Sequence, residues 1–177
     1  MDGSPQIMPW KGWIAISPDQ TALTLYPFPA ELINKRMREV LFCNNPEIDQ
    51  IIDWLLEGSG KMLRPRLVFL SASMNPHDTL LITDVAVAVE LVHMASLIHD
   101  DVIDQSNLRR GRESLNSRWG NQASVLTGDY LFAAAYSLIN RHQQQQIIDL
   151  LSTTIQIMCA GEIKQMALAY KLDVNQD

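Results

Sequence analysis

The chain has 177 residues, a hydrophobic share of 47% and a formal net charge of −6, with a pI near 5.1. It is long enough for one domain with a sizeable core, or for part of a larger domain, and its acidity argues against nucleic-acid binding as a bulk property. The two cysteines, Cys43 and Cys159, lie far apart in apolar contexts, so we expect reduced thiols in the core and no disulfide.

Residues 1–29 are rich in proline and contain two tryptophans. Their short β-favouring runs leave an extended arm, a pair of strands and disorder as alternatives. We expect no secretory signal, because no cationic region followed by an apolar core is present. The longest apolar run is interrupted by Glu90, His93 and the aspartates after them, so we also expect no membrane span. These features together predict a cytoplasmic protein.

From residue 30 onward the apolar residues follow helical spacing, first over Ala30–Leu41 and then over Ile48–Leu56. A glycine-rich break at residues 58–60 leads to Lys61 and Arg64, and Pro65 is suited to the first position of a helix that runs to Met74. Cations at the start of a helix after a glycine-rich loop favour an anion site, since free backbone N–H groups and the helix dipole point the same way. The alternative is an ordinary basic helix start.

A long helix, capped by Asp78 or Thr79 and ending near Ile103, is apolar on nearly all sides, which predicts burial at the centre of the fold. Its C-terminal end carries Asp100, Asp101 and Asp104, where mutual repulsion and the helix dipole both oppose negative charge. A bound cation explains this placement, and ligands with only oxygen atoms favour Mg²⁺. The alternative is a solvated acidic turn.

The remaining chain predicts two further helices, Asn121–Arg141 and Gln144–Lys171, in which Gly128 allows close packing. His93 lies on nearly the same helical face as Asp100 and Asp104. No strand pattern appears after residue 30. The fold class is therefore all-α, an antiparallel bundle with short connections.

Four sequence segments occur in an order typical of one enzyme family. The segment ELVHMASLIHDDVIDQSNLRRG resembles the first aspartate-rich region of the trans-prenyltransferases, the isoprenyl (polyprenyl) diphosphate synthases. GKMLRP precedes it, and WGNQASVLTGDYL and GEIKQ follow it in the family's order. The resemblance runs from about Ile33 to Lys171 and implies that residues 30–177 form the N-terminal half of an isoprenoid-synthase helical domain.

The resemblance also implies roles for individual residues in prenyl transfer, the condensation of isopentenyl diphosphate with an allylic prenyl diphosphate. It implies that Asp100 and Asp104 bind Mg²⁺ with support from Asp101, and that Arg109 holds the allylic diphosphate. The diphosphate of isopentenyl diphosphate would be held by four residues: Lys61, Arg64, His93 and Arg110. These residue types suit the task, because arginine gives bidentate contacts to phosphate and lysine a compact charge.

Ala95 and Ser96 precede Asp100 by about one turn, and both are small. In the resembling family, small residues here accompany longer products, so we expect a medium or long polyprenyl chain, longer than four isoprene units. Glu113 and Ser114 stand where the family usually has a Pro-Thr pair. The extra carboxylate would either weaken diphosphate binding or pair with Arg112.

The family's Lys-Thr pair and second aspartate-rich motif are absent from this sequence. We therefore expect an incomplete bundle that works as a homo- or hetero-oligomer or with a C-terminal partner. Two alternatives remain. One is a non-catalytic binding or regulatory subunit of a heteromeric prenyl synthase. The other is a class I terpene cyclase, which the GKMLRP segment and the Arg109–Arg110 pair disfavour, because a cyclase holds no second diphosphate.

Overall fold

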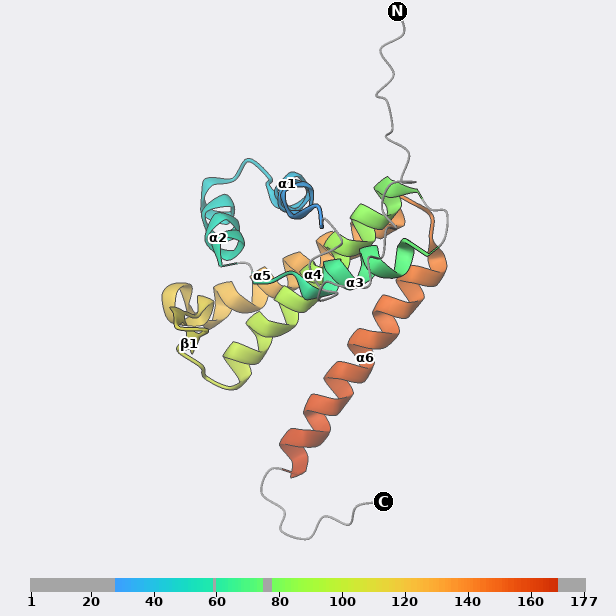
Figure 1. Cartoon of the computed structure of the whole chain (residues 1–177). Helices are drawn as coiled ribbons and strands as arrows, with labels where there is room; N and C mark the ends of the chain where they lie inside the picture. The colour runs from blue at the N-terminus through green and yellow to red at the C-terminus, as the bar shows by residue number, and fades with distance from the viewer. Residues whose placement is uncertain (1–27, 59, 75–77, 169–177) are drawn as a thin grey trace, which may run out of the picture.

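The computed structural model describes residues 28–58, 60–74 and 78–168, and this part of the chain is all-α, as predicted. The predicted N-terminal arm, apart from its last two residues, lies outside the described residues. The described elements are α1 (Ala30–Leu41), α2 (Pro46–Glu57), α3 (Leu63–Ala72), α4 (Thr79–Ile103), α5 (Leu115–Asn140) and α6 (Gln145–Leu168), with strands β1 (Leu108–Arg109) and β2 (Arg112–Glu113) between α4 and α5 (Figure 1).

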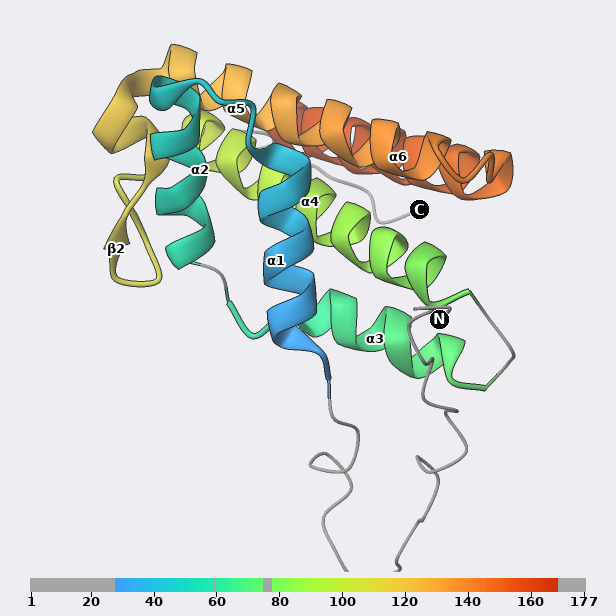
Figure 2. The ribbon, with the colours of Figure 1, turned by 90° about the horizontal axis from the view of Figure 1, so that it is seen from above.

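Helix α4 is the centre of the arrangement. It begins where predicted, after Asp78, whose carboxylate accepts a hydrogen bond from the Leu80 N–H at 2.8 Å, and it ends at Ile103. Helix α5 runs antiparallel beside it, and α1 crosses over it (Figures 1 and 2). An apolar helix surrounded on several sides satisfies the expectation of a buried centre.

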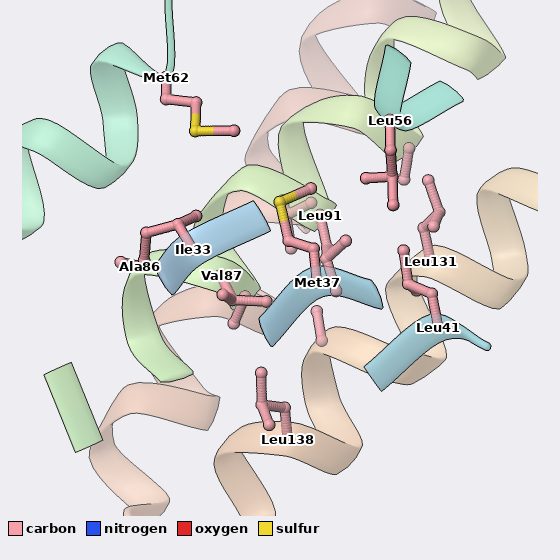
Figure 3. Packing of buried hydrophobic residues seen from close by; sticks show 14 of the residues in the cluster. Ile33, Met37, Leu41, Leu56, Met62, Ala86, Val87, Leu91, Leu131 and Leu138 are labelled. Atoms are coloured by element: carbon pink, nitrogen blue, oxygen red, sulfur yellow. The ribbon is translucent and has the colours of Figure 1, made fainter. Parts of the chain in front are cut away.

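The core lies where α1 meets α4 and α5 (Figure 3). Ile33, Met37 and Leu41 recur every four residues along α1 and are fully buried, so they form one continuous apolar face. The opposing surface is built from side chains of α4 and α5, among them Val87, Leu91, Leu131 and Leu138. Helical periodicity therefore determines which face of α1 the core covers.

A polar cluster around the buried Asp84 joins α1, α4 and the turn after α5 beside this core. Asp84 of α4 accepts hydrogen bonds from Arg36 of α1 at 2.7 and 3.1 Å, and its Oδ2 lies 2.7 Å from Nε2 of His142. Burial alone would raise the pKa of Asp84, but the hydrogen bonds from Arg36 and His142 outweigh it and lower that pKa. The carboxylate is thus held charged in the interior and fixes α1 against α4 and the end of α5.

The predicted helix boundaries need correction in two places. Helix α3 begins at Leu63, so Pro65 occupies its third position, where its missing N–H still costs no hydrogen bond. Helix α5 begins at Leu115, six residues before the predicted start at Asn121. A kink at Gly120, with φ +85° and ψ 165°, interrupts its helical periodicity there, and glycine adopts such a φ without strain.

Two other predictions were wrong. A short antiparallel ladder, β1 with β2, follows α4, although no strand was expected after residue 30. Two-residue strands leave no alternation to detect in a sequence. Cys43 and Cys159 are both exposed and not in the core, because Cys43 lies in the loop after α1 and Cys159 lies on an outer face of α6.

Helix α4 also meets the length and composition criteria for a membrane span, with a mean hydropathy of 1.8 in its most apolar window. The expectation that Glu90 and His93 keep this run below the length of a span was therefore wrong. Of that window, 61% is buried inside the chain. A core helix of a soluble protein passes the same test, so hydropathy does not assign α4 to a membrane.

Helix α6 differs from the other long helices. Only Leu151 is buried in it, and its first turns pack on the core through Ile147, Ile148 and Ile155. Beyond these turns the helix diverges from α4 and α5 (Figure 1). Its large apolar side chains there are exposed, including Ile157, Ile163 and Met166.

Candidate functional site

A cavity of about 740 Å³ lies between the end of α2, the start of α3, the middle of α4 and the β1–β2 hairpin. Each of these elements contributes charge to its wall. The titratable and charged residues that line it are Glu57, Lys61, Arg64, Glu90, His93, Asp101, Arg109, Arg110, Arg112 and Glu113. The wall also has an apolar part, formed by Trp54, Met94, Leu97 and Ile98 among others. Five guanidinium and ammonium groups therefore line one cavity together with four carboxylates, and such cations are the groups that bind phosphate oxygens in proteins.

The glycine-rich loop fits closely against the arginines of the hairpin. A Cβ on Gly60 would lie 2.3 Å from Nη1 of Arg110, and one on Gly58 would lie 2.7 Å from Nη1 of Arg112. The loop then enters α3 through Met62, which has φ +49° and gives the helix no side-chain cap. No side chain therefore caps the N–H groups of the first turn, and the anion site expected there stays a prediction.

The hairpin is fixed to α2 by Arg112. Its Nη2 lies 3.2 Å from Oε2 of Glu57, and its guanidinium stacks 4.5 Å from the centre of the Trp54 ring. Arg112 therefore pairs with Glu57, and the anticipated pair with Glu113 is not formed. Glu113 instead accepts a hydrogen bond from Ser117 at 3.3 Å.

Ser114, the second residue that departs from the family pattern, is buried and donates a hydrogen bond to the Ser106 carbonyl at 2.7 Å. Asn116 donates to the Asp101 carbonyl at 3.3 Å. These two bonds close the loop between α4 and α5 on itself. They join the chain on the two sides of the hairpin that carries Arg109 and Arg110.

Asp101 forms a close ion pair with Arg109. Nε of Arg109 lies 3.0 and 2.8 Å from the two carboxylate oxygens, and Nη2 lies 2.8 Å from Oδ1. Asp101 is 5% exposed, so this carboxylate is directed toward the hairpin and away from solvent. The hydrogen bond that Arg109 donates to Asp101 outweighs the opposing effect of burial and raises the pKa of Arg109.

Asp100 and Asp104 lie one turn apart at the end of α4, outside the cavity. Burial raises the pKa of Asp100; the charge of Arg109 lowers it, and the charges of Asp104 and Asp101 raise it further. Among the described residues, no three acidic, histidine or cysteine side chains gather closely enough to hold a metal ion by themselves. Two carboxylates fit Mg²⁺, which usually takes one or two protein carboxylates and completes its coordination with water and phosphate oxygens.

His93 and Glu90 lie one helical turn apart on the wall that α4 gives to the cavity. Burial lowers the pKa of His93 to about 4, assisted by the positive charges of Arg64, Arg110 and Arg109, so the imidazole is neutral at pH 7. Burial raises the pKa of Glu90, against the attraction of Arg64 and Arg110.

The structure thus brings Lys61, Arg64, His93, Arg109 and Arg110 together around one cavity. It places the Asp100–Asp104 pair beside this cavity, at the end of α4. Ala95 is fully buried, Ser96 is half-buried, and neither lines this cavity. Their proposed effect on product length stays a prediction. Sequence reasoning did not single out Glu90 or Trp54. The only signal for Glu90 is its position three residues before His93, on the same helical face.

Comparisons with known proteins agree with this geometry. The profile of the family described as polyprenyl synthetase matches residues 45–177. The chain is 35% identical over 145 residues to heptaprenyl diphosphate synthase component 2 of Bacillus subtilis, covering 82% of this chain and 42% of the relative. It is 43% identical over 119 residues to the protein of the same name from Geobacillus stearothermophilus, covering 67% of this chain and 37% of that relative.

Two solved structures show the same helical arrangement. A decaprenyl diphosphate synthase from Rhodobacter capsulatus matches with a TM-score of 0.78 and 34% identity over 84% of this chain and 46% of that one. A polyprenyl synthase from Caulobacter crescentus, complexed with calcium and isoprenyl diphosphate, matches with a TM-score of 0.77 and 31% identity over 83% of this chain and 45% of that one. The chain therefore spans less than half the length of these four proteins. The profile match and the shared helical fold together show that the chain belongs to the polyprenyl synthetase family.

Proposed function

We propose that this chain carries the diphosphate-binding half of an enzyme for Mg²⁺-dependent prenyl transfer, which condenses isopentenyl diphosphate with an allylic prenyl diphosphate. The observation that carries the proposal is the cavity with its cations beside a pair of carboxylates at one helix end. Prenyl transfer needs two diphosphates held side by side. The cationic cavity would hold one diphosphate, and the adjacent carboxylate pair would hold the other through Mg²⁺.

The diphosphate of isopentenyl diphosphate would lie in the cavity. Lys61 and Arg64 would contact it from the start of α3, and Arg110 would contact it from the hairpin. His93, being neutral, would donate a hydrogen bond from one ring nitrogen without adding charge. The apolar wall of Met94, Leu97 and Ile98 would receive the hydrocarbon and exclude water.

The allylic diphosphate would lie at the end of α4, where Asp100 and Asp104 would hold Mg²⁺. When bound, the ion neutralises the charge that develops on the diphosphate as the allylic bond ionises. Arg109 lies between the two places, paired with Asp101 and close to Asp100. Its guanidinium would bind the allylic diphosphate, and Asp101 would keep it in position.

The product would be a medium- or long-chain polyprenyl diphosphate. The curated and solved relatives include heptaprenyl, octaprenyl and decaprenyl diphosphate synthases by name. The small side chains of Ala95 and Ser96 support the same assignment. We further propose that the protein acts in the cytoplasm.

We also propose that these residues act together with further helices, in a homo- or hetero-oligomer. The exposed apolar side chains of α6 support this, since soluble monomers rarely expose a large contiguous apolar surface. The name "component 2" of the Bacillus subtilis relative describes a protein with at least one other component.

Calorimetry with a non-hydrolysable analogue of isopentenyl diphosphate tests the cavity. Binding should weaken by about tenfold or more when Lys61→Ala and Arg110→Ala are combined, since each removes a charge-assisted contact. Lys164→Ala, on the exposed part of α6, is the matched control and should bind as the unchanged chain does. Equal binding by the double variant would reject the site.

Turnover distinguishes the candidate functions. The chain should be supplied with a C-terminal half from a homologous polyprenyl synthase and assayed with radiolabelled isopentenyl diphosphate. Incorporation that disappears with Asp100→Ala and Asp104→Ala supports catalysis by this chain. Incorporation that survives both changes supports a non-catalytic subunit. Consumption of a prenyl diphosphate without isopentenyl diphosphate supports a cyclase.

A further inference from the structure

Glu90 is the one acidic side chain of the cavity wall that is buried without an ion-pair partner among the described residues. It is 6% exposed, and its Oε2 atom is buried with no hydrogen-bond partner in the described part of the chain. An unpaired buried carboxylate is costly, and it is retained only where something else stabilises it. The other buried acid of the wall, Asp101, has Arg109 as its partner.

The charges facing Glu90 come from every element around the cavity. Arg64 of α3 and Arg110 of the hairpin act on it most, and both favour its ionised form. The remaining titratable and charged groups of the wall are Glu57 of α2, Lys61 of the glycine-rich loop, His93 and Asp101 of α4, and Arg109, Arg112 and Glu113 of the hairpin. These cations offset only part of the cost of burial, which remains the larger effect and raises the pKa of Glu90.

A diphosphate in this cavity would change that balance. It would neutralise the two arginines, which are the groups that favour the charged carboxylate, and would place negative oxygens beside Glu90. Like charges in one buried site cannot both remain ionised at low cost, as paired carboxylates show. Burial, which favours the protonated form, would then act unopposed.

We propose that the carboxyl group of Glu90 takes up one proton from solvent when a diphosphate enters the cavity, and then donates a hydrogen bond to one of its oxygens. This inference rests on the proposed function, because it requires the cavity to be a diphosphate site. The proton balance is simple: one proton leaves the buffer, the carboxylate becomes a carboxylic acid, and no other bond forms or breaks. Glu90 would thereby favour an anion that can accept a hydrogen bond at the cavity floor.

Calorimetric titration of the chain with inorganic pyrophosphate, without Mg²⁺, tests the proposal. The titration is repeated near pH 7 in two buffers of different ionisation enthalpy, and the dependence of the observed heat on that enthalpy gives the protons taken up. Pyrophosphate exchanges protons itself, so the proton uptake is compared between the unchanged chain and each variant at the same pH. The unchanged chain should take up about one proton more than Glu90→Gln.

Two control variants sharpen the comparison. Glu113→Gln makes the same chemical change at an exposed position of the wall and should keep the full proton uptake. His93→Gln should also keep it, because the proton is assigned to Glu90. As pH rises, pyrophosphate affinity should fall more steeply for the unchanged chain than for Glu90→Gln, by up to about tenfold per pH unit.

The outcomes separate this inference from the proposed function. If pyrophosphate binds and Glu90→Gln takes up as many protons as the unchanged chain, the inference is wrong while the diphosphate site stands. Loss of the extra proton in His93→Gln, but not in Glu90→Gln, assigns it to the imidazole and also overturns the inference. Failure of the unchanged chain to bind pyrophosphate rejects both. Circular dichroism confirms the fold of each variant.

Discussion

The imidazole of His99, at the end of α4, lies directly over Gly128 of α5. Its Nε2 atom is 3.1 Å from the Val125 carbonyl oxygen, and a Cβ on Gly128 would lie 2.2 Å from that same nitrogen. The ring also packs against Phe132, with centroids 5.7 Å apart. The glycine therefore sets how closely α5 approaches the helix end that carries Asp100.

Replacing Gly128 by alanine should destabilise the fold. The ring of His99 would have to rotate away, losing its hydrogen bond and its packing, at a cost of roughly 1–3 kcal/mol. The gain in helix propensity, about 1 kcal/mol, offsets part of this. Urea unfolding measures the difference. Gly161→Ala in α6, where a Cβ meets nothing within 4 Å, is the matched control and should be neutral or stabilising.

The Mg²⁺ site can be tested by binding alone. A non-hydrolysable prenyl diphosphate analogue should bind the chain at least about tenfold more tightly with Mg²⁺ than without it, a difference of about 1.4 kcal/mol. Combining Asp100→Ala with Asp104→Ala should remove that difference, because the ion then loses both carboxylates. Asp149→Ala, exposed on α6, should retain it. An affinity that does not respond to Mg²⁺ would contradict the assignment.

Asp84 predicts a pH dependence of stability. Its pKa is lowered in the folded chain, so its contribution is fully present above the pKa of the unfolded carboxyl, near pH 4, and is lost as pH falls through the folded value. At pH 6, Asp84→Asn should lower the free energy of unfolding by about 3 kcal/mol, since it leaves Arg36 without its buried partner. The gap between the two proteins should narrow between pH 5 and pH 3. A gap that stays constant over this range would show that the charge of Asp84 is not responsible.

Product length should respond to Ala95. In an active complex with the complementary half, Ala95→Phe should shorten the polyprenyl product, because the ring would obstruct the path of the growing hydrocarbon. Ala95 is fully buried, so the larger side chain will also cost roughly 1–3 kcal/mol of stability. Ser96→Phe, at a half-buried position, is the milder companion. Chromatography of the dephosphorylated products measures the length, and an unchanged distribution in both variants would place the end of the product tunnel elsewhere.

The exposed side chains of α6 predict self-association of the chain in isolation. Ile157 and Ile163 of α6 are each 67% exposed, and the C-terminal part of this helix diverges from α4 and α5 (Figure 1). Ile157→Lys combined with Ile163→Lys should lower the apparent mass in light scattering toward that of a monomer. Leu67→Lys on α3, 60% exposed, is the control for an apolar residue elsewhere. A monomeric unchanged chain would contradict this prediction.

Sequence patterns predicted the parts of this molecule that depend on local order. The cap of α4 follows from the Asp78 side chain at the helix boundary, and the buried face of α1 follows from its periodicity. The residues expected to hold a diphosphate were identified by resemblance to a family, and the structure places four of them, with Arg109, around one cavity.

Only the tertiary structure decided which partner each charged group has. Asp101 pairs with Arg109, and Arg112 pairs with Glu57 and stacks on Trp54, because the hairpin between α4 and α5 packs against α2 and the glycines that follow it. Glu90 lacks a partner for the same reason, since no described side chain reaches its Oε2 atom. The Arg112–Glu57 pair joins residues 55 positions apart. Local propensity carries no information about contacts at that separation, because they form only when the helices pack.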